Sequence, residues 1–329
     1  MKDSIKITKY VFIALAVVAV LAGYLARQGK LGGHRARIED PLQGDFKMFQ
    51  LEPVDPALIG YDEIAQLKIN LANLTALAVN PDKLFVAGDS VIVVLTRSGK
   101  EIASLSLEKS AKCLAISPDN QLYVGFKDKI NILNLERFVI TDWVGLNSTA
   151  EITSIAVSES DVFIADAGNK VVLRYNKAGE LINRIGARNP DQGQVGFIIP
   201  SPYFDVAIGH AGLLWAVNSG RLALENYTFD GKLSSSWESE STGIEGFCGC
   251  CNPSHIAILS NGSFVTSEKG IPRVKVYDQT GKFQTVVAGP EQFIEGTVGL
   301  DLAVDAHDRV YVLDPGKKAV RVFVKKEDL

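Results

Sequence analysis

Three of the chain's four cysteines, Cys248, Cys250 and Cys251, lie within four positions, and His255 follows shortly after them. Thiols and an imidazole this close together are typical of a soft-metal site, an iron-sulfur ligand set or a strained disulfide. Cys248, Cys250, Cys251 and His255 have the softness that zinc or copper ligands require, although zinc sites usually leave two or more residues between ligands. We therefore expect metal-linked or redox-linked chemistry at this segment.

Other interpretations of the cysteines stay open beside a zinc or copper site. A Cys-Gly-Cys disulfide or a vicinal Cys250–Cys251 disulfide suits an oxidising compartment, and the vicinal bond closes a strained ring that favours redox activity. The thiols also suit an iron-sulfur cluster whose ligand set a partner protein completes. Finally, they are compatible with a purely structural role, in which the thiols carry no chemistry.

The rest of the sequence indicates which elements position this segment. Six segments share one pattern of four short strands, and their first strands recur 37 to 51 residues apart, a period typical of propeller blades. Turn sequences such as Asn261-Gly262 and Asp230-Gly231 fall where hairpins are needed. The pattern predicts an all-β, six-bladed β-propeller over residues 62–329. The six first strands are Leu77–Val79, Leu114–Ile116, Ile155–Val157, Val206–Ile208, Ile256–Ile258 and Leu302–Val304.

The strand count also predicts how the propeller closes. The sixth unit stops after its third strand, Ala319–Val324, and therefore lacks an outer strand. Glu63–Leu71 precedes the first unit and resembles the fourth strands of the other units, such as Glu180–Ile185. A propeller that takes its last outer strand from the N-terminal side leaves no broken blade edge. We expect Glu63–Leu71 to complete the sixth blade.

Several units resemble the NHL-repeat propellers, from about Ile64 to Val324. The unit with Ile155–Val157 and Val162–Tyr175 resembles that family's consensus, and Cys248–Tyr277, with its CGCCNP motif, resembles a segment of uncharacterised bacterial membrane-anchored members. The resemblance implies an NHL-like six-bladed fold. It implies no single activity, because the family includes binding platforms as well as lyases and lactone-cleaving relatives. Such lyases place metal-binding histidines near the channel, where this chain has one.

Strand register places a second group of reactive side chains at the central channel. The residue just before each innermost strand is expected at the channel mouth, on the face where the linkers between blades lie. That places His255 between Asp205 and Asp301 on adjacent blades. The three residues suggest a metal-dependent lyase or hydrolase in which a cation polarises the substrate and His255 is a ligand or a base. Polar side chains at a wet channel mouth also need no function. The six positions are Ala76, Cys113, Ser154, Asp205, His255 and Asp301.

The same face receives the long linkers. Residues 187–202, 238–254 and 288–299 join the later blades, whereas the earlier joins are shorter. Long loops on one side of a rigid scaffold often carry function. Four residues that end second strands are expected on this face and suit either cation or peptide binding or, more commonly, turn formation. They are Asp166, Asn218, Glu268 and Asp314.

The N-terminus predicts a membrane anchor. Lys2, Lys6 and Lys9 precede the uncharged run Tyr10–Ala26, which as a helix would reach about 25 Å against a hydrocarbon core of about 30 Å. We interpret residues 1–26 as a transmembrane signal-anchor, with a signal peptide as the alternative, and residues 27–61 as a tether. Export is the usual purpose of such a segment, so we expect the propeller on the extracytoplasmic, periplasmic side of the cell membrane.

Charge and partners complete the prediction. The formal net charge is −4 and no basic cluster is visible, so no nucleic acid is expected as a partner. We expect a membrane-anchored binding or interaction module that meets a protein partner in a membrane-associated assembly through its Cys/His site. A purely structural interaction platform is a third possibility. Whether the chain is an enzyme stays open.

Overall fold

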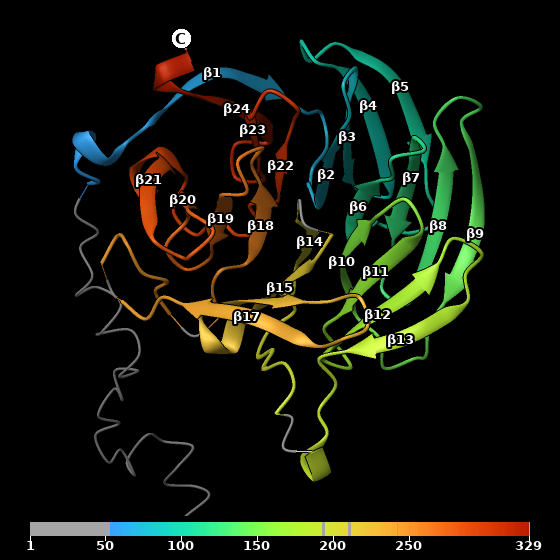
Figure 1. Cartoon of the computed structure of the whole chain (residues 1–329). Coiled ribbons are helices and arrows are strands. Elements are labelled where there is room, and N and C mark those ends of the chain that lie inside the picture. The colour runs from blue at the N-terminus through green and yellow to red at the C-terminus, as the bar shows by residue number, and fades with distance from the viewer. Residues whose placement is uncertain (1–52, 193–194, 210–211, 242, 250, 329) are drawn as a thin grey trace, which may run out of the picture. The chain divides into compact units, whose positions relative to one another are not determined.

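The computed structural model describes residues 53–328 except 193–194, 210–211, 242 and 250. Six four-stranded antiparallel sheets surround a central axis (Figure 1). Their innermost strands, β2, β6, β10, β14, β18 and β22, lie around the centre of that view. The predicted all-β, six-bladed propeller is therefore confirmed.

Each of the first three blades runs outward in chain order. Blade 1 contains β2 (Ala76–Val79), β3 (Lys83–Gly88), β4 (Val91–Thr96) and β5 (Glu101–Ser106). Blade 2 contains β6 (Cys113–Ile116), β7 (Gln121–Gly125), β8 (Lys129–Asn134) and β9 (Val139–Gly145). Blade 3 contains β10 (Ile152–Val157), β11 (Asp161–Asp166), β12 (Val171–Asn176) and β13 (Leu181–Ile185).

The last three blades follow the same order until the chain ends. Blade 4 contains β14 (Val206–Ile208), β15 (Leu214–Asn218), β16 (Ala223–Tyr227) and β17 (Leu233–Glu238). Blade 5 contains β18 (His255–Ile258), β19 (Phe264–Glu268), β20 (Arg273–Tyr277) and β21 (Phe283–Ala288). Blade 6 contains β22 (Leu302–Val304), β23 (Val310–Asp314), β24 (Ala319–Lys325) and β1 (Tyr61–Lys68).

Helices are short throughout the described chain. All five are 3-10 turns, and none has the length and apolar character that a membrane span requires. The predicted anchor at Tyr10–Ala26 lies outside the described residues. The five turns are Pro56–Leu58, Pro190–Gln192, Ser219–Arg221, Pro290–Gln292 and Lys326–Asp328.

The middle strands of each blade are buried on both faces because neighbouring blades pack against both sides. Every residue of β11 and β19 is buried, whereas the outer strand β5 alternates between exposed and half-buried residues. A strand covered on both faces reads as a continuous apolar run rather than an alternating one. This explains runs such as Val162–Ala165 in the sequence.

The hydrophobic core is a ring of seams between adjacent blades. In the described residues six apolar clusters are found, and each joins two neighbouring blades. Phe163 of blade 3, for example, shares a cluster with Val206 and Leu214 of blade 4. Each blade is therefore stabilised by its two neighbours, and closure of the ring protects both ends of the series.

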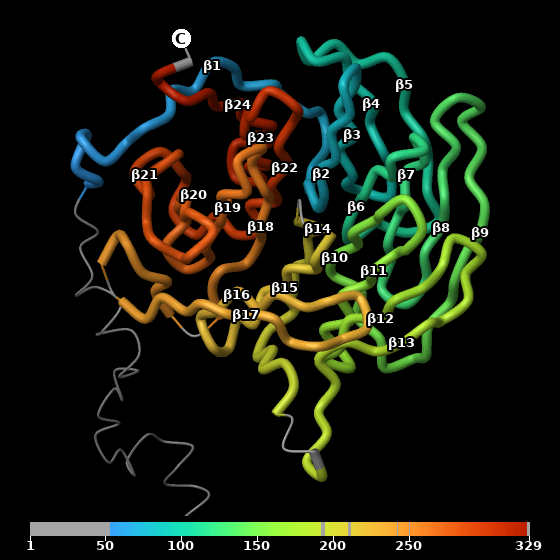
Figure 2. Tube along the Cα trace, in the orientation of Figure 1, coloured from blue at the N-terminus to red at the C-terminus, as the bar shows by residue number. Residues whose placement is uncertain are grey.

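The closing strand comes from the N-terminal side, as predicted. β1 pairs antiparallel with β24, and Figure 2 shows the blue N-terminal strand beside the red C-terminal one. Its bounds, Tyr61–Lys68, begin and end earlier than the predicted Glu63–Leu71. The chain leaves the sheet after Ile69, because the next segment turns to bind its backbone amides to Asp89.

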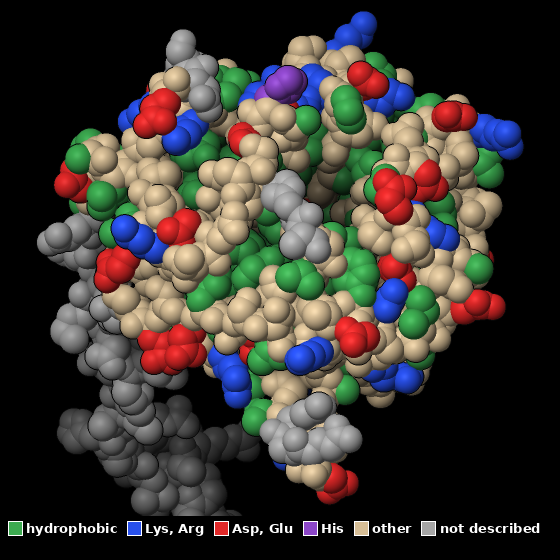
Figure 3. Space-filling model, in the orientation of Figure 1, with side chains coloured by type: hydrophobic (Ala, Val, Ile, Leu, Met, Phe, Trp, Pro, Cys, Tyr) green, Lys and Arg blue, Asp and Glu red, His purple; other side chains and the backbone are tan. Residues whose placement is uncertain are grey.

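Charges of both signs are interspersed on the surface seen in Figure 3. Lys and Arg side chains alternate with Asp and Glu around the rim, and hydrophobic side chains surround the hollowed centre. No single-sign patch dominates this face. The pattern agrees with the mixed composition of the sequence.

Candidate functional site

The linkers that join successive blades define one face of the propeller, which we call the linker face. Residues 186–205, 239–254 and 289–301 form the long linkers between blades 3 and 4, 4 and 5, and 5 and 6. The joins 107–112 and 146–151 are shorter. We call residues 239–254 the Cys loop, because they contain Cys248, Cys250 and Cys251.

A small polar cavity lies at the channel mouth where the innermost strands begin. Its volume is about 100 Å³, the space of a few water molecules. Five of the six channel-mouth positions expected from the register contribute to its lining, and Ala76 does not, although the next residue, Leu77, does. These five are Cys113, Ser154, Asp205, His255 and Asp301.

His255 lies between two carboxylates in this cavity. Its Nδ1 is 3.6 Å from Asp205 Oδ2 and 3.6 Å from Asp301 Oδ1. The imidazole is largely buried, with 18% of its side chain exposed. Both carboxylates face Nδ1, and no hydrogen bond or ion pair to Nε2 is found among the described residues. Carboxylates that orient one imidazole nitrogen leave the other aligned for binding or proton transfer.

Burial and the neighbouring charges shift the titration of this cluster. Burial raises the pKa of the Asp301 carboxyl to about 6; the charge of Asp205 adds to this effect, and His255 opposes it. For His255 the largest effect, burial, lowers the pKa, but the ion pair with Asp205 and the charge of Asp301 outweigh it, so its pKa is raised. The imidazole and the carboxyl therefore titrate as a coupled pair.

The two aspartates also hold neighbouring blades together, a role that sequence analysis missed. The N–H of Ile256 in blade 5 donates to Asp205 Oδ2 of blade 4 (2.8 Å). The N–H of Leu77 in blade 1 donates to Asp301 Oδ2 of blade 6 (2.7 Å). In the sequence, residues with polar acceptor atoms recur immediately before the apolar innermost strands. This recurrence could have indicated that these side chains form hydrogen bonds to the neighbouring blade.

Ser154 repeats the bridge between blades 3 and 4. The N–H of Val206 donates to Ser154 Oγ (3.3 Å), and the same amide also donates to Asp205 Oδ1 (2.9 Å). A hydroxyl therefore stands in blade 3 where carboxylates stand in blades 4 and 6. The cavity floor is a structural ring as well as a candidate site.

Cys113, the fourth cysteine, is a buried free thiol in the same layer. Burial raises its pKa, and the charges of Asp301 and Asp205 raise it further. It pairs across the sheet with Gly125, where a larger residue would collide with the sulfur. A thiol held protonated in this way is a weak nucleophile.

The remaining cysteines do not meet His255 at one group in the described chain. Cys248 is half-buried and has a free thiol, Cys251 is buried, and Cys250 lies outside the described residues. Neither Cys248 nor Cys251 lines the cavity. No three described His, Cys, Asp or Glu side chains are grouped to hold a metal ion. The described donors thus do not by themselves form a zinc, copper or iron-sulfur site.

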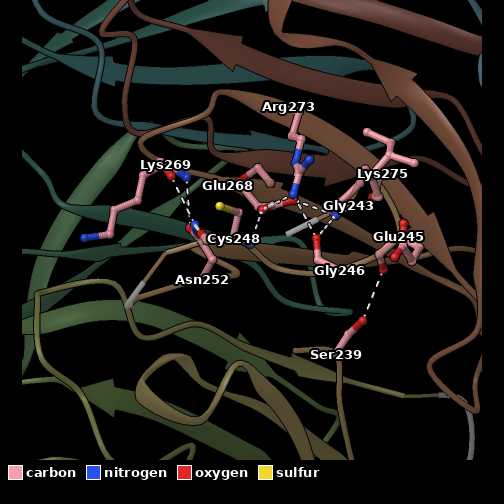
Figure 4. A network of polar contacts seen from close by, with 12 residues as sticks. Ser239, Gly243, Glu245, Gly246, Cys248, Asn252, Glu268, Lys269, Arg273 and Lys275 are labelled. Atoms are coloured by element: carbon pink, nitrogen blue, oxygen red, sulfur yellow. Dashed lines mark hydrogen bonds and ion pairs between the residues drawn. The ribbon is translucent and has the colours of Figure 1, made fainter. Parts of the chain in front are cut away.

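A buried ion cluster fixes the Cys loop to blade 5 (Figure 4). Glu268 Oε1 lies 2.8 Å from Arg273 Nε and 2.7 Å from Lys275 Nζ, and all three side chains are almost completely buried. Both cations donate to the carbonyl of Gly246, at 2.8 Å from Arg273 and 2.6 Å from Lys275. The N–H of Cys248 donates to Glu268 Oε2 (3.1 Å). The cluster therefore fixes the backbone immediately before and at the first cysteine.

Burial in this cluster destabilises the charged form of Lys275. Burial lowers its pKa to about 8, and the charge of Glu268 only partly offsets that effect. Its ammonium lies 5.2 Å from the ring centroids of both Phe247 and Tyr277, where cation–π attraction supports it. Two buried cations around one carboxylate make Glu268 the member whose loss would be most severe.

The residues that end second strands anchor linkers in other blades too. Asp166 Oδ1 accepts from the N–H of Glu151 (3.0 Å), and Asn218 Oδ1 accepts from the N–H of Ile198 (2.9 Å). Glu268 accepts from the N–H of Cys248 in the same way. In blades 3, 4 and 5, therefore, a side-chain oxygen at the end of the second strand accepts from a backbone N–H of the preceding linker. From the sequence these residues suit ligand binding or, more commonly, turn formation. Turn formation is confirmed for Asp166, whose Oδ1 also accepts from the N–H of Asn169 (3.1 Å), and for Asp314, whose Oδ1 accepts from the N–H of Lys317 (2.9 Å). The anchoring of linkers is an additional role that the sequence did not indicate.

Comparisons with known proteins support the architecture. No protein-family model and no curated protein sequence matches the chain. Virginiamycin B lyase from Staphylococcus aureus superposes with a TM-score of 0.58 at 12% identity, over 80% of this chain and 99% of the lyase. A catalytically inactive variant of that lyase, with a histidine replaced by alanine and with quinupristin, gives 0.56 at 14% identity over 80% and 99%. A streptogramin B lyase gives 0.58 at 11% identity over 83% and 100%. At these identities the likeness shows the six-bladed propeller fold alone.

Proposed function

We propose that this chain is a membrane-anchored extracytoplasmic propeller that acts as a binding module through its linker face, with the Cys loop as its redox- or metal-responsive part. One observation carries the proposal. The His255 cavity and the Cys loop lie on adjacent parts of blade 5, since the loop ends at residue 254 and β18 begins at His255. A rigid scaffold that presents an oriented imidazole beside a clamped thiol loop is suited to recognition of a polar group.

The Cys loop supports the redox form of the proposal more directly than the metal form. Cys248 is partly accessible and its thiol is free, so it can exchange with a disulfide of a partner protein. A metal form needs a donor set that includes Cys250, because the described donors are not grouped for it. Extracytoplasmic location, expected from Tyr10–Ala26, favours oxidised thiols.

The proposal is tested on the purified domain, residues 53–329, by elemental analysis and thiol counting. We expect Cys250→Ser and His255→Ala each to remove the same bound metal or to shift the same thiol reactivity, and their effects to be non-additive. A disulfide would leave His255→Ala silent while Cys250→Ser exposes a thiol to an alkylating reagent. If the thiols are reduced and unreactive and no metal is bound, the chain is instead a purely structural interaction platform.

Location is tested separately on whole cells. The full chain is expected to fractionate with membranes, and protease added from outside the cytoplasmic membrane should digest the propeller. Recovery in the soluble cytoplasmic fraction would contradict the anchor and remove the argument for an oxidising compartment.

The oriented imidazole favours a second candidate, a metal-dependent lyase or hydrolase that uses His255 with Asp205 and Asp301. In this case the carboxylates would orient Nδ1, and Nε2 would take a proton from a carbon of the substrate in a lyase or from water in a hydrolase. The bond to the leaving group breaks in the same reaction, and the imidazolium returns the proton to that group. Replacement of a histidine accompanies inactivity in one structurally similar lyase. The test is a screen of cyclic esters and depsipeptides with the wild type and His255→Ala: turnover that His255→Ala abolishes supports an enzyme, and no turnover supports the binding module.

A further inference from the structure

Asn252 connects the Cys loop to a turn of blade 5. Its side chain is almost completely buried and donates to the carbonyl oxygens of Cys248 and of Lys269, the latter at 3.0 Å. Its Oδ1 accepts from the N–H of Lys269 (2.9 Å). The backbone of Lys269 is thus fixed relative to the first cysteine (Figure 4).

The side chain of Lys269 points away from this network, as Figure 4 shows, and it contacts a different linker. Its Nζ donates to Ser201 Oγ (3.1 Å) and lies 5.0 Å from the ring centroid of Tyr203. Ser201 and Tyr203 belong to the linker between blades 3 and 4. One lysine therefore joins the two linkers that border the candidate site.

Tyr203 in turn packs on His255. The two ring centroids are 6.0 Å apart and the rings are nearly perpendicular, at 88°. Burial raises the pKa of the Tyr203 phenol, which agrees with a ring that packs against neighbouring side chains. The tyrosine lies against the imidazole of the cavity from the linker between blades 3 and 4.

We infer that Lys269 is a positioning residue that holds Tyr203 as a cover on His255 and that, through Asn252, it makes this cover responsive to the Cys loop. The inference rests on the proposed function in taking the His255 cavity as the binding site. Two sites joined in this way influence each other reciprocally. A ligand or modification at Cys248 would then change access to His255 without touching it.

The cover is tested by the rate at which diethyl pyrocarbonate modifies His255, followed by peptide mass spectrometry in the folded domain. We expect Tyr203→Ala and Lys269→Met each to accelerate modification by about fivefold or more, the low end of typical coupling between sites. Lys269→Arg should restore the slow rate, because a guanidinium also binds an aromatic face. Lys170→Met is the matched control, since Lys170 occupies the corresponding turn of blade 3, and it should leave the rate unchanged.

The link to the Cys loop is tested by Asn252→Ala and by alkylation of Cys248 with N-ethylmaleimide in Cys250→Ser protein. Both should accelerate His255 modification, and neither should add to the effect of Lys269→Met. Faster modification of His255 in Tyr203→Ala, together with an unchanged modification rate in Lys269→Met, would overturn the role of Lys269. Unchanged rates in Asn252→Ala and in the alkylated protein would overturn the link. Circular dichroism and thermal midpoints show that each variant is folded, and rates measured with and without a metal chelator separate the effect of the tyrosine cover from that of a metal bound at His255.

Discussion

At the residue scale, the His255 cluster makes stability depend on pH. The folded pKa of Asp301 is about 6, above its ordinary 3.8, and that of His255 is also raised above 6.5. A raised folded pKa means that the folded state holds the proton more tightly. The stabilisation is fully present below the unfolded pKa and is lost as pH rises through the folded value.

We therefore expect the domain to lose stability as pH rises from about 4 through 6, where Asp301 titrates, and to lose more above pH 6.5 as His255 deprotonates; Asp301→Asn should flatten the lower part of this dependence. The shift of Asp301, about two pKa units, corresponds to about 3 kcal/mol at most. Urea unfolding at several pH values measures it. Asp82→Asn, at an exposed turn away from the channel, is the control and should keep the wild-type slope. An unchanged slope in Asp301→Asn would show that this carboxyl does not titrate in the window.

At the element scale, the Cys loop depends on a single buried carboxylate. Glu268 neutralises Arg273 and Lys275 and also accepts the Cys248 amide. Glu268→Gln leaves two buried cations without an anion, and breaking buried pairs in this way costs about 3 to 5 kcal/mol. We expect that loss in denaturant unfolding, together with faster alkylation of Cys248.

Two comparisons make this result specific. Lys275→Met should cost less, because the Glu268–Arg273 pair survives and a methionine fills the apolar site between Phe247 and Tyr277. Glu136→Gln, at an exposed turn of blade 2, should leave both stability and alkylation unchanged. Equal losses for Glu268→Gln and Lys275→Met would mean that packing, rather than charge balance, holds the loop.

The limits of sequence analysis are clearest at this scale. Strand order, closure and the placement of His255 beside two aspartates follow from periodicity, which is local and repeats six times. The cluster of Glu268, Arg273 and Lys275 was not anticipated, because alternating charged and apolar residues in Arg273–Tyr277 read as a half-exposed strand. That polar face is buried because the Cys loop covers it. The repeat pattern of the sequence does not predict the path of this loop.

The cysteines illustrate the same limit. Spacing alone suggested that Cys248 and His255 share a site, whereas the described residues connect them through Asn252, Lys269 and Tyr203. Side-chain contacts between different linkers depend on tertiary packing, and a single sequence contains no pattern for them. Their roles in metal binding or redox chemistry stay predictions.

At the scale of the whole molecule, the ring holds together because every blade shares an apolar seam with each neighbour. The weakest point of such a ring is where the two chain ends meet. Here β1 supplies a ladder to β24 and also an ion pair, in which Nη2 of the buried Arg321 lies 2.6 Å from Oε2 of the partly exposed Glu63. Arg321 also donates to the carbonyl of Gln292 (3.2 Å), which extends the closure to the linker before blade 6.

Removing β1 should therefore affect the whole domain and not just its edge. A chain that begins at residue 69 loses the outer strand of blade 6. Among the described residues it leaves Arg321 with Asp314, at 3.5 Å, as its one carboxylate partner. The exposed edge of β24 then invites pairing between molecules. We expect a lower thermal midpoint, broader unfolding and oligomers in size-exclusion chromatography.

The matched control is the chain that begins at Pro53, which keeps β1 and should unfold cooperatively as a monomer. Glu63→Gln separates the two contributions of the strand, because it keeps the ladder and removes the charge that neutralises Arg321. If closure depends chiefly on the ladder, Glu63→Gln stays monomeric with a modestly lower midpoint, and the deletion alone forms oligomers. If the deleted chain instead unfolds at the control's midpoint and remains monomeric, the six blades are stable without closure, and the seams between blades suffice to hold the ring.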